Sequence, residues 1–317
     1  KVYARFNTDP NLGMGLVSMA FDPDYAKNGK FYTVHTENPR RTQDAQAPSN
    51  VAMPSLDLSQ HKVTPQFTVP AGVTLYESIV TEWRDTNIGN ATFEGTAREL
   101  MRIGTNFARH PVGDLLFNPL ANPGDADYGN LYISTGDGEA GERAGVTHPV
   151  PQRLDALPGK ILRITPDITL RPQDKLAASG QYRIPSTGAN ANPFVNVPVA
   201  HGEIFAYGLR NPHRIFWDAP TNTLLAAGLF DDLVGRPTHK AALATLRNLE
   251  WVGWNTRTGF IAFPNTVTYG PVGYIPQAFA VLIGRDAGLG VVRTYYLARL
   301  FASVTFVALA PTSITSL

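Results

Sequence analysis

The side chains of this sequence that could transfer protons or bind a metal are few and scattered. No two of its histidines have the helical spacing of a metal-binding pair, so a histidine-rich metal site would need distant residues to converge. A neutral histidine can accept a proton near pH 7, and a carboxylate usually orients such a base. His110 stands before Pro111, a context that by itself is typical of a surface or capping histidine. The seven histidines are His35, His61, His110, His148, His201, His213 and His239.

Asp137, Arg210 and Asn211 each lie in a context with two interpretations. Asp137 follows Gly136 and precedes Gly138 at the end of an apolar run, where the glycines permit a ligand-facing turn or an ordinary Asx turn. Arg210 and Asn211 could provide a cationic fork and an amide donor for an anionic ligand. The same two residues could equally form a structural ion pair and a turn before Pro212.

Several catalytic classes lack the residues that they need. The absence of cysteine excludes a thiol nucleophile, a cysteine-based zinc site and a disulfide framework. The sequence has no Gly-x-Ser-x-Gly elbow, no His-Glu-x-x-His, no Walker loop and no Gly-x-Gly-x-x-Gly opening a helix. Hydrolase, zinc protease, phosphoryl-transfer and nicotinamide-dependent functions therefore lose support.

The scaffold that must position these residues is predicted to be all-β. The chain has 28 Gly, 25 Pro and only 17% charged residues, which is typical of short strands joined by tight turns. Residues 240–249 are the exception, a short helix or a poorly patterned loop, and residues 40–66 and 174–199 are expected to be long surface excursions. Strands are predicted at residues 16–21, 30–36, 79–83, 99–103, 114–117, 131–135, 160–164, 204–207, 215–218 and 223–227.

Charge and hydropathy limit the partners and the location. The chain has 27 basic and 26 acidic residues, so no global field attracts nucleic acid, and we expect no nucleic-acid partner. The longest apolar stretch, residues 297–310, is too short to span a bilayer and contains Arg299; we expect buried strands there and no membrane span. The chain begins at Lys1 without a leader, so we expect a secreted or periplasmic protein whose signal has been removed.

Several segments, in order, resemble the glucose/sorbosone dehydrogenase family of quinoprotein sugar dehydrogenases. Residues 15–25 with 28–32 resemble the opening blade of the family, and residues 93–103 resemble the strand that leads to its catalytic histidine. The most specific segment is 203–214, Glu-Ile-Phe-Ala-Tyr-Gly-Leu-Arg-Asn-Pro-His-Arg. The resemblance covers residues 13 to about 259 and leaves 260–317 unaligned; its other segments are 110–119, 129–138, 157–164 and 253–259.

The resemblance implies a six-bladed β-propeller of four-stranded antiparallel blades, with residues 1–317 in a single domain. Roughly 50 residues per blade would be available, within the range of propeller repeats. It also implies a sugar dehydrogenase that oxidises an aldose hydroxyl by hydride transfer to pyrroloquinoline quinone (PQQ), with calcium and an external electron acceptor. By motif position, His110 would be the general base, Asp137 its orienting carboxylate, and Arg210 and Asn211 the contacts to the cofactor.

The sequence departs from the family pattern at two places. Family members carry Asn-Gly-Gly after the catalytic histidine, whereas Pro111, Val112 and Gly113 follow it here, and Gly113 would permit close approach of backbone to a ligand. The family holds calcium largely through backbone carbonyls, which by position would be those of Gly228 and Leu229, but the segment before Gly228 is shortened.

Other cation and anion contacts have no motif behind them. Asp125 and Asp127 have the spacing of a hard-cation loop without the rest of an EF-hand, and a solvated turn is the simpler explanation. Arg285, Arg293 and Arg299 are candidates for the remaining basic contacts to the carboxylates of the quinone.

Two other functions fit the same scaffold. A propeller that has lost the cofactor would act as a sugar-binding or protein-binding module; the altered turn after His110 and the shortened calcium segment favour it. Joint retention of His110, Asp137, Arg210 and Asn211 argues against it. A propeller hydrolase acting on a lactone would need a side-chain metal cage on its axis, for which the sequence offers no clear set of ligands.

Overall fold

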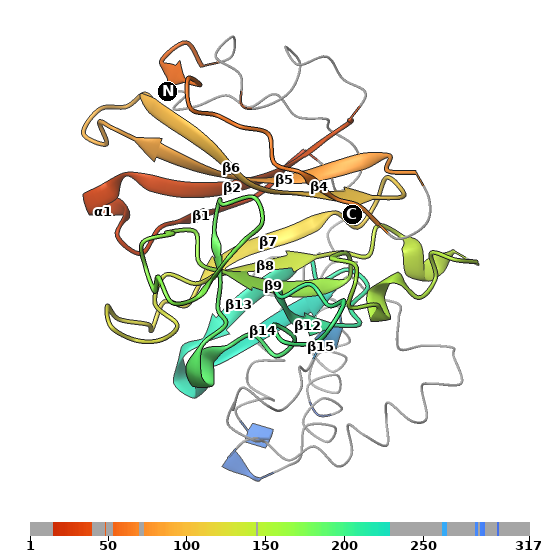
Figure 1. Ribbon diagram of the computed structural model, residues 1–317. Coiled ribbons are helices and arrows are strands. Elements are labelled where there is room, and N and C mark those ends of the chain that lie inside the picture. Colours follow the sequence, from red (N-terminus) through yellow and green to blue (C-terminus); the bar gives the residue numbers. More distant parts are fainter. Residues whose placement is uncertain are drawn as a thin grey trace, which may run out of the picture. The chain divides into compact units, whose positions relative to one another are not determined.

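The computed structural model describes residues 15–39, 48, 53–69, 73–143, 145–228 and 262–264, together with 283, 284, 286–288 and 297 (Figure 1). The chain divides into two units, Lys1–Gly228 with Thr256–Ala262, and Leu229–Asn255 with Phe263–Leu317. The first unit holds all candidate site residues except Leu229, Arg285, Arg293 and Arg299, and the description below concerns that unit. That one propeller domain spans residues 1–317 stays a prediction.

The first sheet has the strand order β1-β2-β5-β6-β3, with β4 beside β6. Its four main strands pair antiparallel, whereas the two short strands β3 and β4 run parallel to β6. The helical turn α1 (Tyr25–Asn28) joins β1 to β2 and ends at Gly29, whose φ of 66° is favourable only for glycine. The bounds are β1 (Leu16–Phe21), β2 (Lys30–Glu37), β3 (Leu56–Asp57), β4 (Gln66–Phe67), β5 (Tyr76–Asp85) and β6 (Gly95–Thr105).

The second sheet is a four-stranded antiparallel meander in the order β12-β9-β8-β7, and β13 with β14 begins a third sheet. The bounds are β7 (Val112–Phe117), β8 (Leu131–Thr135), β9 (Lys160–Ile164), β10 (Lys175–Leu176), β11 (Arg183–Ile184), β12 (Ile204–Tyr207), β13 (Arg214–Asp218), β14 (Thr223–Gly228) and β15 (Ala262–Pro264). The 3-10 turns are η2 (Ala140–Glu142), η3 (Val150–Gln152), η4 (Gly188–Asn190) and η5 (Ala219–Thr221).

The prediction of an all-β fold is confirmed at the level of several antiparallel sheets. All ten predicted strands are present, and β1, β8, β9 and β12 have the predicted bounds. The closed ring of six four-stranded blades stays a prediction. Residues 240–249, for which a short helix or a poorly patterned loop was expected, lie outside the described residues, as does the stretch 297–310 apart from Leu297.

The prediction of a surface excursion at residues 174–199 is wrong for its first part, whereas Val197 and Val199 near its end are exposed. This segment contains the β10-β11 ladder, and Ala177, Tyr182 and Ile184 are buried in the main hydrophobic core. The Tyr182 hydroxyl donates a hydrogen bond to the buried Glu203 at 2.7 Å. The segment folds back onto the core because burial of these apolar side chains is favourable, and its proline and glycine content does not reveal this.

The sheets meet along their first strands, with β7 against both β1 and β13 (Figure 1). Asp114 on β7 connects all three strands. Its Oδ1 accepts a hydrogen bond from the Ser18 hydroxyl at 2.5 Å, and its Oδ2 accepts one from the Ile215 backbone N–H at 3.1 Å. This side-by-side packing of first strands is the arrangement that propeller blades require.

We expect Asp114→Ala to lower the free energy of unfolding by about 1–3 kcal/mol, because the Ile215 N–H and the Ser18 hydroxyl lose a charged acceptor. Urea denaturation followed by circular dichroism measures the effect. Asp57→Ala is the matched control, since Asp57 is exposed and, among the described residues, its carboxylate accepts hydrogen bonds only from the nearby Ser59. Equal shifts for both variants would contradict the role of Asp114 between the sheets.

Candidate functional site

The structure brings His110 and Asp137 into direct contact. His110 lies between β6 and β7, and Asp137 follows β8. The His110 Nδ1 is 2.8 Å from the Asp137 Oδ1, and the side chain of His110 is 11% exposed while that of Asp137 is fully buried. Because Asp137 occupies Nδ1, Nε2 is the ring nitrogen that would serve as a base.

Asp137 is surrounded by hydrogen-bond donors. Its Oδ1 also accepts the Glu139 N–H at 2.9 Å, and its Oδ2 accepts the Gly141 N–H at 2.9 Å. A carboxylate that accepts two backbone N–H groups is stabilised in its ionised form. An ionised Asp137 can only accept, so the shared proton lies on His110 Nδ1, and this assignment follows from the hydrogen-bond network.

The backbone at this contact is strained. His110 has a φ of 53°, a left-handed conformation that costs a non-glycine residue on the order of 1–3 kcal/mol. Its carbonyl oxygen accepts the Gly138 N–H at 3.1 Å, and the neighbouring Gly136 N–H donates to the Pro111 carbonyl at 2.9 Å. The turn after β8 therefore holds His110 from both its backbone and its side chain.

Gly136 is required by this close packing. A Cβ at position 136 would lie 2.3 Å from the His110 carbonyl oxygen, closer than any real contact. We expect Gly136→Ala to displace the His110 loop and to lower the free energy of unfolding by about 1–3 kcal/mol through overpacking. Thermal unfolding measures this, with Gly89→Ala as control, because only Asn87 Oδ1 at 3.7 Å lies near a Cβ there. A Gly136→Ala protein as stable as the control would contradict the steric argument.

Arg210 and Asn211 lie beside the pair. The Asp137 N–H donates to the Arg210 carbonyl at 2.7 Å, which ties the 208–211 segment to the turn after β8. Asn211 is only 6% exposed, and its Oδ1 is buried with no hydrogen-bond partner among the described residues. An amide with an unsatisfied buried atom, next to a half-buried guanidinium, is the kind of group that a polar ligand would satisfy.

Gly113 was expected to allow the backbone to approach a ligand, but the structure gives a different reason for a glycine at this position. The ladder between β7 and β8 shifts register between Val112 and Asp114. A Cβ on Gly113 would lie 2.7 Å from the Pro212 carbonyl oxygen and 2.8 Å from the His213 Cα. Glycine therefore lets the chain after His110 pack on the chain after Asn211, and the close approach is between two backbones.

The remaining cation candidates do not form a site among the described residues. Asp127 accepts hydrogen bonds from the side chains of Asn118, Asn130 and Tyr132, and Asp125 accepts one from the Asn122 N–H. Both carboxylates therefore stabilise the turn in which they lie. Within the described ranges, no group of three or more His, Asp or Glu side chains could hold a metal ion. Gly228 ends β14, and Leu229, Arg285, Arg293 and Arg299 lie outside the described residues.

A buried lysine at the site was missed by sequence reasoning. Lys160 begins β9, is 0% exposed, and donates from Nζ to the carbonyls of Val150, Pro151 and Pro158. Burial lowers the pKa of Lys160 to about 7, and the negative charges of Asp155 and Asp137 oppose this shift. The available signal was a lysine at the start of an otherwise apolar strand, next to the proline-containing segment that it contacts.

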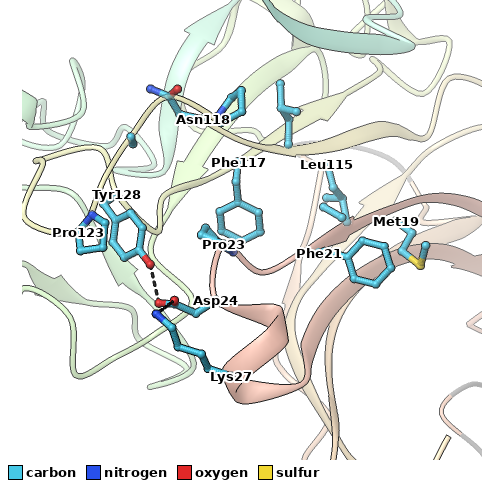
Figure 2. Close-up of a pocket in the computed structure, with 14 residues that line it drawn as sticks. Met19, Phe21, Pro23, Asp24, Lys27, Leu115, Phe117, Asn118, Pro123 and Tyr128 are labelled. Carbon is cyan, nitrogen blue, oxygen red and sulfur yellow. Dashed lines mark hydrogen bonds and ion pairs between the residues drawn. The ribbon is translucent and has the colours of Figure 1, made fainter. Parts of the chain in front are cut away.

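A cavity of about 620 Å³ lies at the opposite end of β7 from His110 (Figure 2). Asp24 accepts hydrogen bonds there from Lys27 at 2.6 Å and from the Tyr128 hydroxyl at 2.5 Å. The hydrogen bond to Asp24, together with burial, raises the pKa of Tyr128 to about 12. None of the candidate site residues lines this cavity, whose walls are Met19, Ala20, Phe21, Pro23, Asp24, Lys27, Leu115, Leu116, Phe117, Asn118, Pro119, Ala121, Pro123 and Tyr128.

This chain is similar to part of several longer curated proteins. The HIPL2 protein of Arabidopsis thaliana is 31% identical over 219 residues, which are 65% of this chain and 28% of that protein. The Hedgehog-interacting protein of Homo sapiens is 27% identical over 203 residues, 63% of this chain and 22% of that protein. The matched region thus spans about a quarter of the curated relatives.

Among the described residues, no helix has the length and apolar character needed to cross a membrane.

Solved structures and a family model were compared as well. The apo-form of the soluble aldose sugar dehydrogenase of Escherichia coli is 20% identical, with a TM-score of 0.44 over 69% of this chain and 45% of that one. The model of the Glucose / Sorbosone dehydrogenase family matches residues 9–229, more than half of the chain. The resemblance identified from sequence segments is confirmed, and this chain belongs to the glucose/sorbosone dehydrogenase family.

Proposed function

We propose that this protein is a quinoprotein sugar dehydrogenase that oxidises an aldose hydroxyl by hydride transfer to PQQ. The observation that carries the proposal is the buried contact between His110 Nδ1 and Asp137 Oδ1, at 2.8 Å, beside Arg210 and Asn211. The 208–211 segment is tied to this pair through the Arg210 carbonyl, which accepts the Asp137 N–H at 2.7 Å, and we assign the Arg210 guanidinium and the Asn211 amide to the same site. Membership of the family supports the same reading.

The residues present fit the cofactor. PQQ carries three carboxylates and an ortho-quinone, and Arg210 and Asn211 would hold it, because a guanidinium pairs with carboxylates and an amide can donate to a quinone oxygen. The burial of the Asn211 side chain, beside the turn that carries Asp137, supports this assignment. When bound, PQQ would supply an electrophilic carbonyl that accepts hydride. Calcium is assigned to the carbonyls of Gly228 and Leu229, from the sequence alone.

The chain itself would manage the proton. His110 Nε2 takes the hydroxyl proton of the sugar while a hydride leaves the carbon that bears this hydroxyl. One proton and one hydride are thus removed, and a carbonyl is formed. The imidazolium that results is stabilised by the carboxylate of Asp137, which two backbone N–H groups hold in place. The fixed Nδ1–H tautomer leaves Nε2 able to accept, which is the state that the reaction needs.

The rest of the assignment belongs to the same proposal. We place the site on one end of a six-bladed propeller, and the packing of β7 against β1 and β13 supports a blade-like arrangement. A small sugar would be the substrate and an external acceptor would reoxidise the cofactor. Secretion or export to a periplasm is proposed with them, and fractionation of the source cells tests it.

A non-catalytic binding module is the second candidate. The relatives include the Hedgehog-interacting protein, whose name states that it binds another protein. The turn after His110 also differs from the Asn-Gly-Gly of the family. A module of this kind would keep the scaffold without binding the cofactor.

One titration separates the two candidates. Metal-free protein is titrated with PQQ and Ca²⁺ and followed by the fluorescence of its four tryptophans, and dye reduction is then measured with a panel of aldoses. We expect saturable binding, and sugar-dependent reduction that His110→Ala lowers by about 10²- to 10⁴-fold. His148→Ala, at an exposed histidine, is the matched control and should keep full activity. Failure of PQQ to bind would favour the binding module.

A further inference from the structure

The geometry around Lys160 selects a charged side chain. Its Nζ lies 3.1, 2.9 and 2.7 Å from the carbonyl oxygens of Val150, Pro151 and Pro158. An ammonium has three N–H donors and matches these three acceptors, whereas a neutral amine has two donors and would turn a lone pair towards an oxygen. The three carbonyl dipoles therefore favour the ammonium form of Lys160, against the burial that lowers its pKa.

The loop that Lys160 holds touches the candidate site at two places. The Pro151 carbonyl also accepts the Gly208 N–H at 2.8 Å, and the Gly159 carbonyl accepts the Leu209 N–H at 3.0 Å. These contacts fix the chain just before Arg210 and Asn211. On the other side, the Gly159 N–H donates to the Gly136 carbonyl at 2.9 Å, next to Asp137.

The charge on Lys160 is costly and has no ion-pair partner among the described residues. Asp155 and Asp137 are the charged groups that act on it, and Asp155 is itself paired with Arg153 at 2.6 Å. A buried charge without a partner costs several kcal/mol, and an apolar side chain of similar volume would avoid that cost. Filling space is therefore a poor explanation for a lysine here.

We propose that Lys160 is a positioning residue of the site, whose ammonium holds residues 150–159 and through them both Asp137 and the 208–211 segment. Its effect on catalysis rests on the proposed function, but its effect on the His110–Asp137 contact does not. Loss of the Lys160 proton removes one of three hydrogen bonds. Because burial lowers the pKa of Lys160 to about 7, the charged form is present below that pH, and the contact should weaken as the pH rises through it.

The test uses the protein without cofactor. In ¹⁵N-histidine NMR, the His110 Nδ1–H bonded to Asp137 should give a downfield proton signal, identified by its loss in Asp137→Asn. We expect Lys160→Met to remove or broaden this signal, and to lower kcat about 10- to 100-fold if the protein oxidises sugars. Lys175→Met, at an exposed lysine, should change neither. An unchanged signal in Lys160→Met would overturn the proposal.

A second variant tests the proposal even if Lys160→Met does not fold. The chain has no cysteine, so Lys160→Cys can be alkylated selectively with 2-bromoethylamine in denaturant and refolded. The resulting side chain keeps an ammonium but is less basic, because its sulfur withdraws electrons. The upper pH limit of the His110 signal should then move to lower pH. An unmoved limit would show that Lys160 acts only as a structural support, whether or not the wild-type protein oxidises sugars.

Discussion

Replacement of Asp137 by asparagine is expected to lower kcat for sugar oxidation by about 10²- to 10⁴-fold, with little change in KM. Two N–H groups point at Oδ1, from His110 and Glu139, and a third points at Oδ2, from Gly141. An asparagine must place its NH₂ group at one of these oxygens. Either orientation therefore sets N–H against N–H: an NH₂ group in place of Oδ1 opposes the Nδ1–H tautomer of His110, and one in place of Oδ2 opposes the Gly141 N–H and displaces the turn.

Two measurements separate positioning from general damage to the fold. The downfield Nδ1–H signal of His110 should disappear in Asp137→Asn. The urea concentration at half-unfolding should change little, although kcat falls strongly. Asp125→Asn is the matched control, since Asp125 accepts a hydrogen bond only from a turn N–H at Asn122. An Asp137→Asn enzyme with wild-type kcat would show that Asp137 does not orient the base.

Replacement of Arg102 by methionine is expected to lower the free energy of unfolding at neutral pH by about 3–5 kcal/mol. Arg102 donates to Glu99 at 3.1 and 2.9 Å and to Glu77 at 2.5 Å, and all three side chains are buried. Burial works to lower the pKa of Arg102, but the hydrogen bond to Glu99 and the charges of both glutamates outweigh it and raise that pKa. Without Arg102, two buried carboxylates lose their shared cation.

The sign of the pH dependence makes this prediction specific. In Arg102→Met the folded state gains by protonating the unpaired carboxylates, so it binds more protons than the unfolded state, and the loss of stability should shrink as the pH falls. Urea denaturation at several pH values measures it. Arg84→Met, on the exposed side of β5, should stay within about 0.5 kcal/mol of wild type at every pH. A loss that does not depend on pH would contradict the charge argument.

The network around Arg102 also bears on the site. Arg102 lies on β6, whose last residue, Thr105, precedes the loop that carries His110. A Cβ on Gly138 would lie 2.8 Å from the Thr105 Cβ, so the end of β6 packs on the turn that holds Asp137. We therefore expect Arg102→Met to weaken the site as well as the sheet.

Local sequence determined the strands of this protein and the identity of its candidate site residues. Short strand-like runs between glycine and proline turns predicted all ten main strands, because burial and turn chemistry act over a few residues. Order and spacing of short segments indicated the family, and with it His110, Asp137, Arg210 and Asn211.

Contacts between distant residues decided what those patterns could not reveal. His110 is 27 residues from Asp137, and its left-handed backbone is unfavourable locally, so it is maintained only by the turn after β8. Gly113 is explained by the backbone after Asn211, and Lys160 by the carbonyls of a loop that folds over it. Ala177, Tyr182 and Ile184 are buried because they meet a core built by other segments. Tertiary structure decided these points, since the cost of strain or of a buried charge is offset only where the chain packs on itself.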